Sequence, residues 1–237
     1  MNVEAFTKGD DVYKKMASAI YNVDEDKVTK DQRFVGKTTI LGAGYGMGAV
    51  KFQSQLKTFG FDIDIDEARH VIKIYREKNE KIGKLWRCAQ HYLKNAYNKE
   101  DKPFGLHGVL KVEGGKIRLP SGLYLSYDEL TATQTDFGFE YSYKTRKGMT
   151  RIYGGKIIEN VCQAIARCII GEQMLMIANK FRVVLTVHDS IVCCVKEEEV
   201  DEAQKYIEEC MRWTPKWAGG LPVDCESGVG KSYGECE

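Results

Sequence analysis

The run VVLTVHDSIVCCV, residues 183–195, constrains the fold more than any other part of the chain. It is apolar and largely β-branched on both sides of a central His-Asp pair, which predicts two strands joined by a turn. A carboxylate in such a run is costly to bury unless it is paired or binds a metal. Asp189 is therefore a candidate metal ligand, with a turn-forming residue as the alternative. Because side chains alternate along a strand, His188 and Ser190 would face away from Asp189, which does not fit a hydrolytic triad.

The elements around this hairpin predict an α+β fold. Residues 155–179 read as a helix that is apolar nearly all round, which predicts a buried helix. The other expected elements are helices over residues 11–23, 29–41, 66–99 (with a break near Gly83) and 196–213, short strands within 106–127, and a last strand at 221–230. We therefore expect a mostly helical first domain over residues 1–145. Residues 146–237 would hold a buried helix, the antiparallel His-Asp hairpin, a helix and a C-terminal strand.

A second motif, RFVGKTTILGAGYGMG, begins at Arg33 and ends in glycines at every second position. Steps of four residues place Arg33, Lys37, Leu41 and Tyr45 on one broad helix face. Cations suit phosphates and a flat apolar end suits a base, so this face predicts a nucleoside triphosphate lying along the helix. The glycines weaken the helix, which should stop or flex there. The alternative is a glycine-rich packing segment whose cations reach the surface by chance.

Other phosphate-binding motifs do not explain the glycines. A phosphate loop of the G-x-x-x-x-G-K-[ST] kind is absent, and a dinucleotide fingerprint would need a preceding strand where a helix is expected. The acidic stretch DIDIDE, residues 62–67, is not an EF-hand loop, because it lacks the glycine at the sixth position and has Lys73 at the twelfth. We interpret it as a loop and helix cap.

Net charge does not by itself predict a nucleic-acid partner, because 35 basic and 34 acidic residues leave the chain at +1. One basic strip stands out, with no acidic residue between Tyr141 and Ile158. The strip consists of Lys144, Arg146, Lys147, Arg151 and Lys156. A local strip of this kind can hold phosphates on a nearly neutral protein, and a solvated loop is the alternative.

Composition also points to a cytoplasmic protein. The eight cysteines form no C-x-x-C pair, so we expect reduced, buried thiols rather than a zinc site. No unbroken apolar run approaches the roughly 18 residues of a membrane span, and the N-terminus lacks a signal-peptide segment. We expect no membrane partner.

Together the motifs resemble those of the family A DNA polymerases, the class of bacterial repair polymerases and many phage replicases. Four segments carry the resemblance, in the order and approximate spacing of that family. They are DDVY (residues 10–13, with Tyr13 where the family has histidine), the fingers-helix motif (Arg33, Lys37, Leu41, Gly42, Tyr45, Gly46), ENVCQAIAR (residues 159–167) and the palm hairpin VHDS (residues 187–190). The C-terminal ESGVGKSYGEC is phage-like.

The resemblance implies roles for the residues of the fingers helix. Arg33 and Lys37 would hold the phosphates of an incoming dNTP, with Tyr13 beside them. Leu41 occupies the position that bears on sugar selection in the family. Tyr45 would stack near the templating base.

It also implies roles for residues of the palm. Gln163, with Asn160 or, after a one-residue slip in the alignment, Glu159, would contact the minor groove of the primer–template. Arg151 and Lys156 of the basic strip are further candidates for contacts to DNA. His188 would touch the primer end. Asp189 would hold Mg²⁺, so Asp189, Lys37 and His188 are the candidate catalytic residues.

Two departures from the family change the expected assembly. Ser190 stands where the family usually has glutamate, and the family's other metal-binding aspartate would fall upstream of Met1. Two-metal phosphoryl transfer needs more negative charge than Asp189 alone supplies. We therefore expect residues 1–145 to be a fingers subdomain and 146–237 the C-terminal part of a palm.

Such a chain would be half of a split polymerase or a cut fragment. A second chain would supply the missing palm strand, the thumb and any exonuclease. The alternatives are a catalytically inactive DNA- or nucleotide-binding module and an RNA-making relative.

Overall fold

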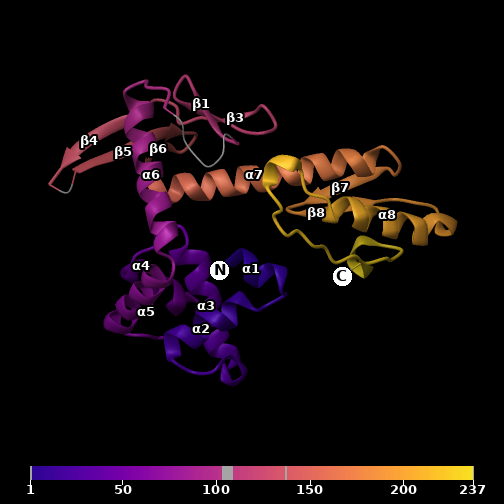
Figure 1. The fold of residues 1–237 in the computed structure, drawn as a ribbon, viewed down its shortest axis with the longest axis horizontal. Helices are drawn as coiled ribbons and strands as arrows, with labels where there is room; N and C mark the ends of the chain where they lie inside the picture. Colours follow the sequence, from indigo (N-terminus) through magenta and orange to yellow (C-terminus); the bar gives the residue numbers. More distant parts are fainter. Residues whose placement is uncertain (1, 103–108, 137, 237) are drawn as a thin grey trace. The chain divides into compact units, whose positions relative to one another are not determined.

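The structure is a computed structural model in which residues 2–102, 109–136 and 138–236 are described (Figure 1). These residues form helices and small antiparallel sheets in separate runs along the chain, which confirms the predicted α+β class. The chain forms two compact units: unit 1 comprises Met1–Arg118 and Tyr124–Cys162, and unit 2 comprises Leu119–Leu123 and Gln163–Glu237. The subdomain boundary expected at residue 145 stays a prediction.

Unit 1 holds six helices and two three-stranded sheets within its described residues, and α7 starts there. The helices are α1 (Asn2–Thr7), α2 (Val12–Tyr21), α3 (Lys30–Ala43), α4 (Ala49–Thr58), α5 (Ile65–Lys78) and α6 (Glu80–Tyr97), with the short 3₁₀ turn η1 (Glu25–Lys27). The strands are β1 (Lys111–Glu113), β2 (Lys116–Arg118), β3 (Tyr124–Leu125), β4 (Thr131–Thr135), β5 (Gly138–Thr145) and β6 (Gly148–Ile152). The helix α7 (Gly154–Ala178) begins in unit 1 and ends in unit 2.

Helices α2 to α5 pack around one hydrophobic core. Phe52 and Leu56 of α4 and Val71 of α5 are at most 1% exposed. Gly36 lets α2 approach α3 closely, because a Cβ there would lie 2.3 Å from the carbonyl oxygen of Tyr13. Local signals set the helix ends. Thr29 forms a capping box at the start of α3, and Asp64, in the stretch interpreted as a loop and helix cap, caps α5. Helices α1 and α4 were not expected from the sequence.

The long helical pattern over residues 66–99 divides at Asn79 rather than near Gly83. Asn79 has φ −122° and ψ 42°, outside the helical region, and its side-chain amide donates to the carbonyl of Tyr75. Gly83 stays within α6, where a glycine costs stability but does not end the helix. The expected break was therefore misplaced.

The two sheets of unit 1 are meanders, with strand orders β1-β2-β3 and β4-β5-β6. The first confirms the short strands predicted within 106–127, although residues 106–108 lie outside the described part. The second sheet was not anticipated, and its β5–β6 hairpin carries most of the basic strip. Tyrosines join α6 to both sheets: the Tyr92 hydroxyl donates to the carbonyl of Gly115, and Tyr97 contacts Tyr141 edge to face.

The helix α7 occupies the predicted position, but it is not buried all round in the described structure. Ile157 and Ile177 are fully buried, whereas Leu175 is 64% exposed and Gln163 and Arg167 are exposed. By length and composition α7 could cross a membrane, with 28% of its most apolar window buried. This is weak support for a membrane segment, because the core helix of a soluble protein passes the same test.

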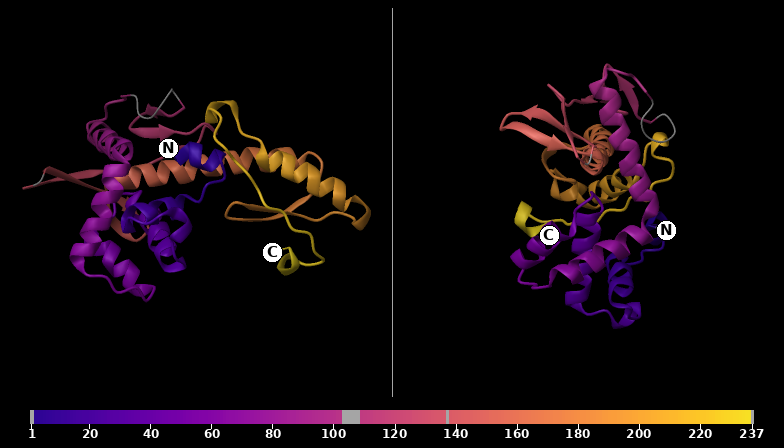
Figure 2. Two further views of the ribbon diagram at one scale, coloured as in Figure 1. Left: turned by 60° about the horizontal axis from the view of Figure 1, so that its bottom comes forward. Right: turned by 90° about the vertical axis from the view of Figure 1, so that its left-hand side faces the viewer.

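Unit 2 is built from the C-terminal part of α7, a two-stranded sheet and a helix (Figure 2). These elements are β7 (Val183–Val187), β8 (Ser190–Cys193), the 3₁₀ turn η2 (Glu197–Glu199), α8 (Val200–Arg212) and the short turns η3 (Lys216–Ala218) and η4 (Tyr233–Glu235). Ile177, Phe181, Ala203 and Cys210 form its core. The fully buried Gln173 ties α7 to the end of α8, since its amide donates to two main-chain carbonyls at 2.7 and 2.9 Å.

The strand expected at residues 221–230 is not formed in the described structure. Pro222 offers no amide hydrogen for a ladder, and no described strand pairs with the segment. Side chains hold it instead: Arg212 donates from Nε to Asp224 at 2.8 Å. All eight cysteines are free thiols, as expected, but only Cys168 and Cys210 are buried.

Candidate functional site

The exposed face of α3 gathers the cations that the sequence predicted to bind phosphates. Val35, Thr39 and Ala43 bury the opposite face, so Lys37 faces solvent and Arg33 is half-buried. Both cations lie beside one aromatic ring of α2: the guanidinium carbon of Arg33 is 5.3 Å from the centroid of the Tyr13 ring, and Lys37 Nζ is 5.9 Å from it. At these distances the ring attracts both cations. The structure thus brings together the three residues predicted to contact a triphosphate.

Asp11 fixes the orientation of Arg33. Its carboxylate caps α2, accepting from the amides of Tyr13 and Lys14 at 3.0 Å, and its Oδ2 accepts from Arg33 Nε at 2.6 Å. Partial burial raises the pKa of Asp11, but the hydrogen bonds from Arg33 and the Lys14 amide outweigh it and leave the pKa below its ordinary value. The sequence analysis missed this role. An aspartate directly before a helix signals a cap, but not a partner 22 residues away.

Leu41 and Tyr45 follow Arg33 and Lys37 at the same four-residue spacing. Leu41 is 52% exposed on α3, and Tyr45 lies in the turn after the helix ends at Ala43. Tyr45 is half-buried. Burial raises the pKa of its hydroxyl, with smaller contributions from the nearby Cys162 and Glu159. Tyr45 therefore stays neutral in the physiological range.

Glycines near Tyr45 in space allow main-chain segments of unit 1 to approach one another closely. A Cβ at Gly155, near the start of α7, would lie 2.5 Å from the carbonyl oxygen of Tyr45. A Cβ at Gly154 would lie 2.0 Å from the carbonyl oxygen of Trp86 on α6. Gly46 has φ +85°, a conformation that glycine adopts without strain. The turn after α3 thus lies close to the start of α7. Among the motif's own glycines, a Cβ at Gly44 would lie 2.6 Å from the carbonyl oxygen of Ile40, whereas one at Gly48 would meet nothing within 4 Å.

The predicted DNA-contacting residues at the start of α7 and on β6 are engaged with neighbours. Arg151 pairs with Glu140 at 2.6 Å, and Lys156 pairs with Glu159 at 2.7 Å. The Asn160 amide donates to the hydroxyl of Tyr127 at 3.1 Å. The Arg151–Glu140 pair is exposed and the Lys156–Glu159 pair is partly exposed, so both contribute little to stability.

Gln163 is exposed on α7. No described residue forms a side-chain hydrogen bond with it. Its amide is therefore free to contact a ligand.

His188 and Asp189 form the two-residue turn between β7 and β8, in the register Val187↔Ser190. The hairpin is the one predicted, but both turn side chains are exposed rather than buried in an apolar strand. His188 has φ +53°, a left-handed conformation that costs a non-glycine residue about 1–2 kcal/mol. Strain of this kind concentrates at functional sites. Unit 2 thus presents the His-Asp pair at an exposed, strained turn.

No group of three or more His, Cys, Asp or Glu side chains able to hold a metal occurs among the described residues. Asp189 offers one carboxylate and Ser190 beside it offers only a hydroxyl. A hard cation such as Mg²⁺ prefers oxygen ligands, which Asp189 fits, but two such ions need further carboxylates. The described residues therefore do not make a complete two-metal site.

Comparison with known proteins supports the resemblance to DNA polymerases. DNA polymerase family A matches residues 2–101. The DNA polymerase of Bacillus phage SP02 is 30% identical over 98% of this chain and 37% of its own length. DNA polymerase I of Helicobacter pylori (strain ATCC 700392 / 26695) is 23% identical over 98% of this chain and 22% of its own length. The chain thus spans between about a fifth and two fifths of these two relatives.

A solved structure shares the fold. It is described as the POL domain of Pol1 from M. smegmatis in complex with DNA primer-template and dNTP. It aligns with a TM-score of 0.63 over 99% of this chain and 36% of that chain, at 19% identity. Sequence relatives along the whole chain and this shared fold agree with the motifs described above. Residues 2–101 thus match DNA polymerase family A, and the relatives that align over nearly the whole chain are DNA polymerases.

Proposed function

We propose that the chain is the fingers and C-terminal palm part of a template-directed DNA polymerase, which joins a dNTP to a primer 3′-hydroxyl. The observation that carries the proposal is the cluster of Tyr13, Arg33 and Lys37 on the open side of α3. Two cations beside an aromatic ring suit a triphosphate, which needs charge-assisted hydrogen bonds. The partners are primer–template DNA and dNTPs, in the cytoplasm, or in the host cytoplasm for a phage-encoded enzyme.

Each residue of the site has a separate proposed role. Arg33, oriented through Nε by Asp11, and Lys37 hold the phosphates, while Leu41 and Tyr45 lie toward the sugar and the templating base. Gln163 and Asn160, with Arg151 and Lys156, contact the DNA, and His188 contacts the primer end. Mg²⁺, held in part by Asp189, would supply charge neutralisation at the reacting phosphate.

We further propose that a second chain completes the enzyme. It would contribute the missing palm strand with the second aspartate, the thumb and any exonuclease. The incomplete metal site supports this proposal, since Asp189 lacks grouped carboxylates among the described residues.

Primer extension tests both proposals. The chain alone should extend poorly, and addition of the upstream polypeptide should restore extension. In the restored enzyme, Lys37→Ala should raise the KM for dNTP at least tenfold, from the loss of about 1.5–3 kcal/mol in a charge-assisted contact. Lys30→Ala, an exposed lysine two turns away on α3, is the matched control and should leave KM unchanged. Equal KM values for the two variants would remove the nucleotide-site assignment.

The alternative is a catalytically inactive DNA- or nucleotide-binding module. Ser190 at the position of the family's glutamate favours it. Asp189→Ala separates the two: the polymerase proposal requires loss of extension with DNA binding retained. Unchanged extension would mean that Asp189 holds no catalytic metal.

A further inference from the structure

The β5–β6 hairpin of unit 1 ends in two cations to which none of the functions above assigns a role. Arg146 and Lys147, which we call the hairpin tip, form the turn between the paired residues Thr145 and Gly148. Both side chains are exposed. Two-residue hairpin turns favour Asn, Asp and Gly, which adopt the left-handed conformations that such turns use. Because two cations do not serve the turn itself, their place at the tip points to a ligand.

The charge of the hairpin tip is not neutralised by the protein. Among the described residues, the side chain of neither Arg146 nor Lys147 forms an ion pair or a hydrogen bond. The other two cations of the hairpin are each paired with a carboxylate at 2.6 Å, in the pairs Lys144–Glu129 and Arg151–Glu140. The tip therefore carries a net charge of about +2. Neighbouring unpaired cations attract an anionic ligand.

The tip is also held in place before any ligand binds. The Thr145 hydroxyl accepts from the amide of Lys147 at 3.2 Å and donates to the carbonyl of Gly148 at 2.8 Å. Gly148 has φ +107°, a conformation that glycine adopts without strain. At its other end the hairpin is anchored in unit 1, where Tyr141 and Ile152 are 4% and 1% exposed. A turn that is already ordered loses less conformational entropy when it binds.

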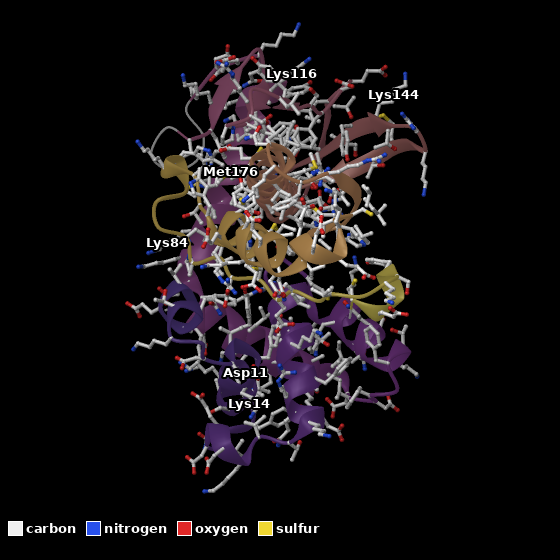
Figure 3. The ribbon with its side chains drawn as sticks, turned by 90° about the vertical axis from the view of Figure 1, so that its right-hand side faces the viewer. Asp11, Lys14, Lys84, Lys116, Lys144 and Met176 are labelled. Atoms are coloured by element: carbon white, nitrogen blue, oxygen red, sulfur yellow. The ribbon has the colours of Figure 1, made fainter. Side chains whose placement is uncertain are left out.

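The strand β6 connects the tip to residues already proposed to contact DNA. Ser142 pairs with Arg151 and Lys144 pairs with Met149, so Lys144 and Arg151 lie on the same face of the sheet. Figure 3 labels Lys144 on the outer part of this sheet. The four residue steps from Lys147 to Arg151 correspond to about 14 Å of extended chain. At about 3.4 Å for each base pair, this length equals about four base pairs of duplex DNA.

The form of the hairpin favours duplex DNA over a single strand. Sites for single strands combine a groove with aromatic side chains on which bases stack. The clefts of about 470 and 560 Å³ on unit 1 include no residue of the hairpin. A two-stranded β-ribbon, by contrast, fits the major groove of duplex DNA, which is about 12 Å wide.

We propose that the β5–β6 hairpin binds double-stranded DNA, with Arg146 and Lys147 holding phosphates about four base pairs from the contact of Arg151. The place of Arg151 on DNA rests on the proposed function. The tip lengthens the contact with the duplex and slows dissociation of the enzyme from DNA, without touching the dNTP.

The test measures binding to the whole chain by fluorescence anisotropy across a series of salt concentrations, with a duplex of about 20 base pairs and with one of its single strands. The double variant Arg146→Ala/Lys147→Ala should bind the duplex about tenfold more weakly. Its slope of log K against log salt should become shallower by about 1.8, since each duplex phosphate contact contributes about 0.9. The loss of affinity should be smaller for the single strand. Equal losses on the two DNAs would overturn the assignment of a duplex.

Two further variants are the controls. Lys111→Ala/Lys116→Ala removes the same charge from two exposed lysines on the other sheet of unit 1, so it should leave the duplex slope nearly unchanged. Arg146→Lys keeps the charge of the tip and should retain the affinity for the duplex. If the tip variant and the Lys111/Lys116 variant have equal slopes, the proposal is wrong.

A second measurement separates this inference from the proposed function. In the reconstituted enzyme, a heparin trap limits each enzyme to one binding event, and the length of the product is compared. The tip variant should give shorter products at an unchanged KM for dNTP, while Lys37→Ala should raise that KM. If only Lys37→Ala has its effect, the hairpin proposal fails and the polymerase proposal stands. If no extension occurs under any condition but the tip variant still loses duplex affinity, the polymerase proposal fails and the hairpin remains a DNA-binding element.

Discussion

Gly36→Ala tests the contact that places Tyr13 beside the two cations of α3. The new Cβ would lie 2.3 Å from the carbonyl oxygen of Tyr13 and 3.0 Å from the amide nitrogen of Ala17. An ordinary carbon–oxygen contact is about 3.3 Å or more, so α2 must move from α3 by about 1 Å. Both atoms belong to the main chain, so no side-chain rotation relieves the contact.

The expected loss combines two opposing terms. Overpacking a well-packed interface costs about 1–3 kcal/mol. Replacing glycine by alanine inside a helix recovers about 1 kcal/mol. The net destabilisation should therefore be up to about 2 kcal/mol. A domain of this size loses about 2–4 °C in Tm for each kcal/mol.

Gly83→Ala is the matched control for stability. Gly83 also lies inside a helix of unit 1, but a Cβ there would meet nothing within 4 Å. It should gain about 0.5–1 kcal/mol. Thermal unfolding by circular dichroism then gives opposite signs for the two variants. If Gly36→Ala is stabilised as much as Gly83→Ala, the described packing of α2 on α3 is incorrect.

The same substitution has a functional consequence. Displacing α2 moves the Tyr13 ring away from Arg33 and Lys37, and it moves Asp11, which holds Arg33. Under the proposed function, the KM for dNTP should rise relative to the unsubstituted enzyme. An unchanged KM in a destabilised Gly36→Ala variant would show that triphosphate binding does not depend on the position of α2.

Three further perturbations test other parts of the structure. Burial raises the pKa of Tyr127 to about 12. The contribution of this residue to the free energy of unfolding should therefore be fully present below pH 10 and be lost as the pH rises from 10 toward 12. Urea unfolding across this range should show a smaller fall in stability for Tyr127→Phe than for the unsubstituted chain. Trp86→Phe removes the bond to the carbonyl of Gly44 and should cost about 1 kcal/mol in chemical denaturation. Gln173→Leu removes the donor to the carbonyls of Met211 and Trp213, which belong to half-buried residues, so it should destabilise unit 2 by about 1–3 kcal/mol. An unchanged thermal transition would contradict these two hydrogen bonds.

Features with local causes could be predicted from the sequence. The cap at Thr29 and the apolar face of α3 lie within a few residues of one another, and so do the β-branched runs on either side of His188. Such signals need no knowledge of the rest of the fold. The same holds for Asp64, whose side chain caps the helix that follows it.

Features with distant causes could not be predicted. The bond between Asp11 and Arg33 joins two helices, and the Tyr45–Gly155 contact joins segments far apart in the sequence. The β4–β6 sheet was missed because its strands are rich in polar and exposed residues, which weakens the alternating pattern. The strand predicted at residues 221–230 does not form, because strand formation depends on a neighbouring strand and no described strand pairs with this segment.

The β7–β8 hairpin links the stability of the chain to its proposed chemistry. Val184, Leu185 and Val187 are 49%, 46% and 36% exposed, and the outer edges of both strands pair with no described strand. A two-stranded hairpin is marginally stable by itself, and its turn must also hold His188 in a left-handed conformation. Asp189 is therefore only as well fixed as the hairpin that carries it. A strand added by a partner would cover these apolar side chains and satisfy an open edge, so under the proposed function binding of the partner and placement of the metal-binding carboxylate are one event.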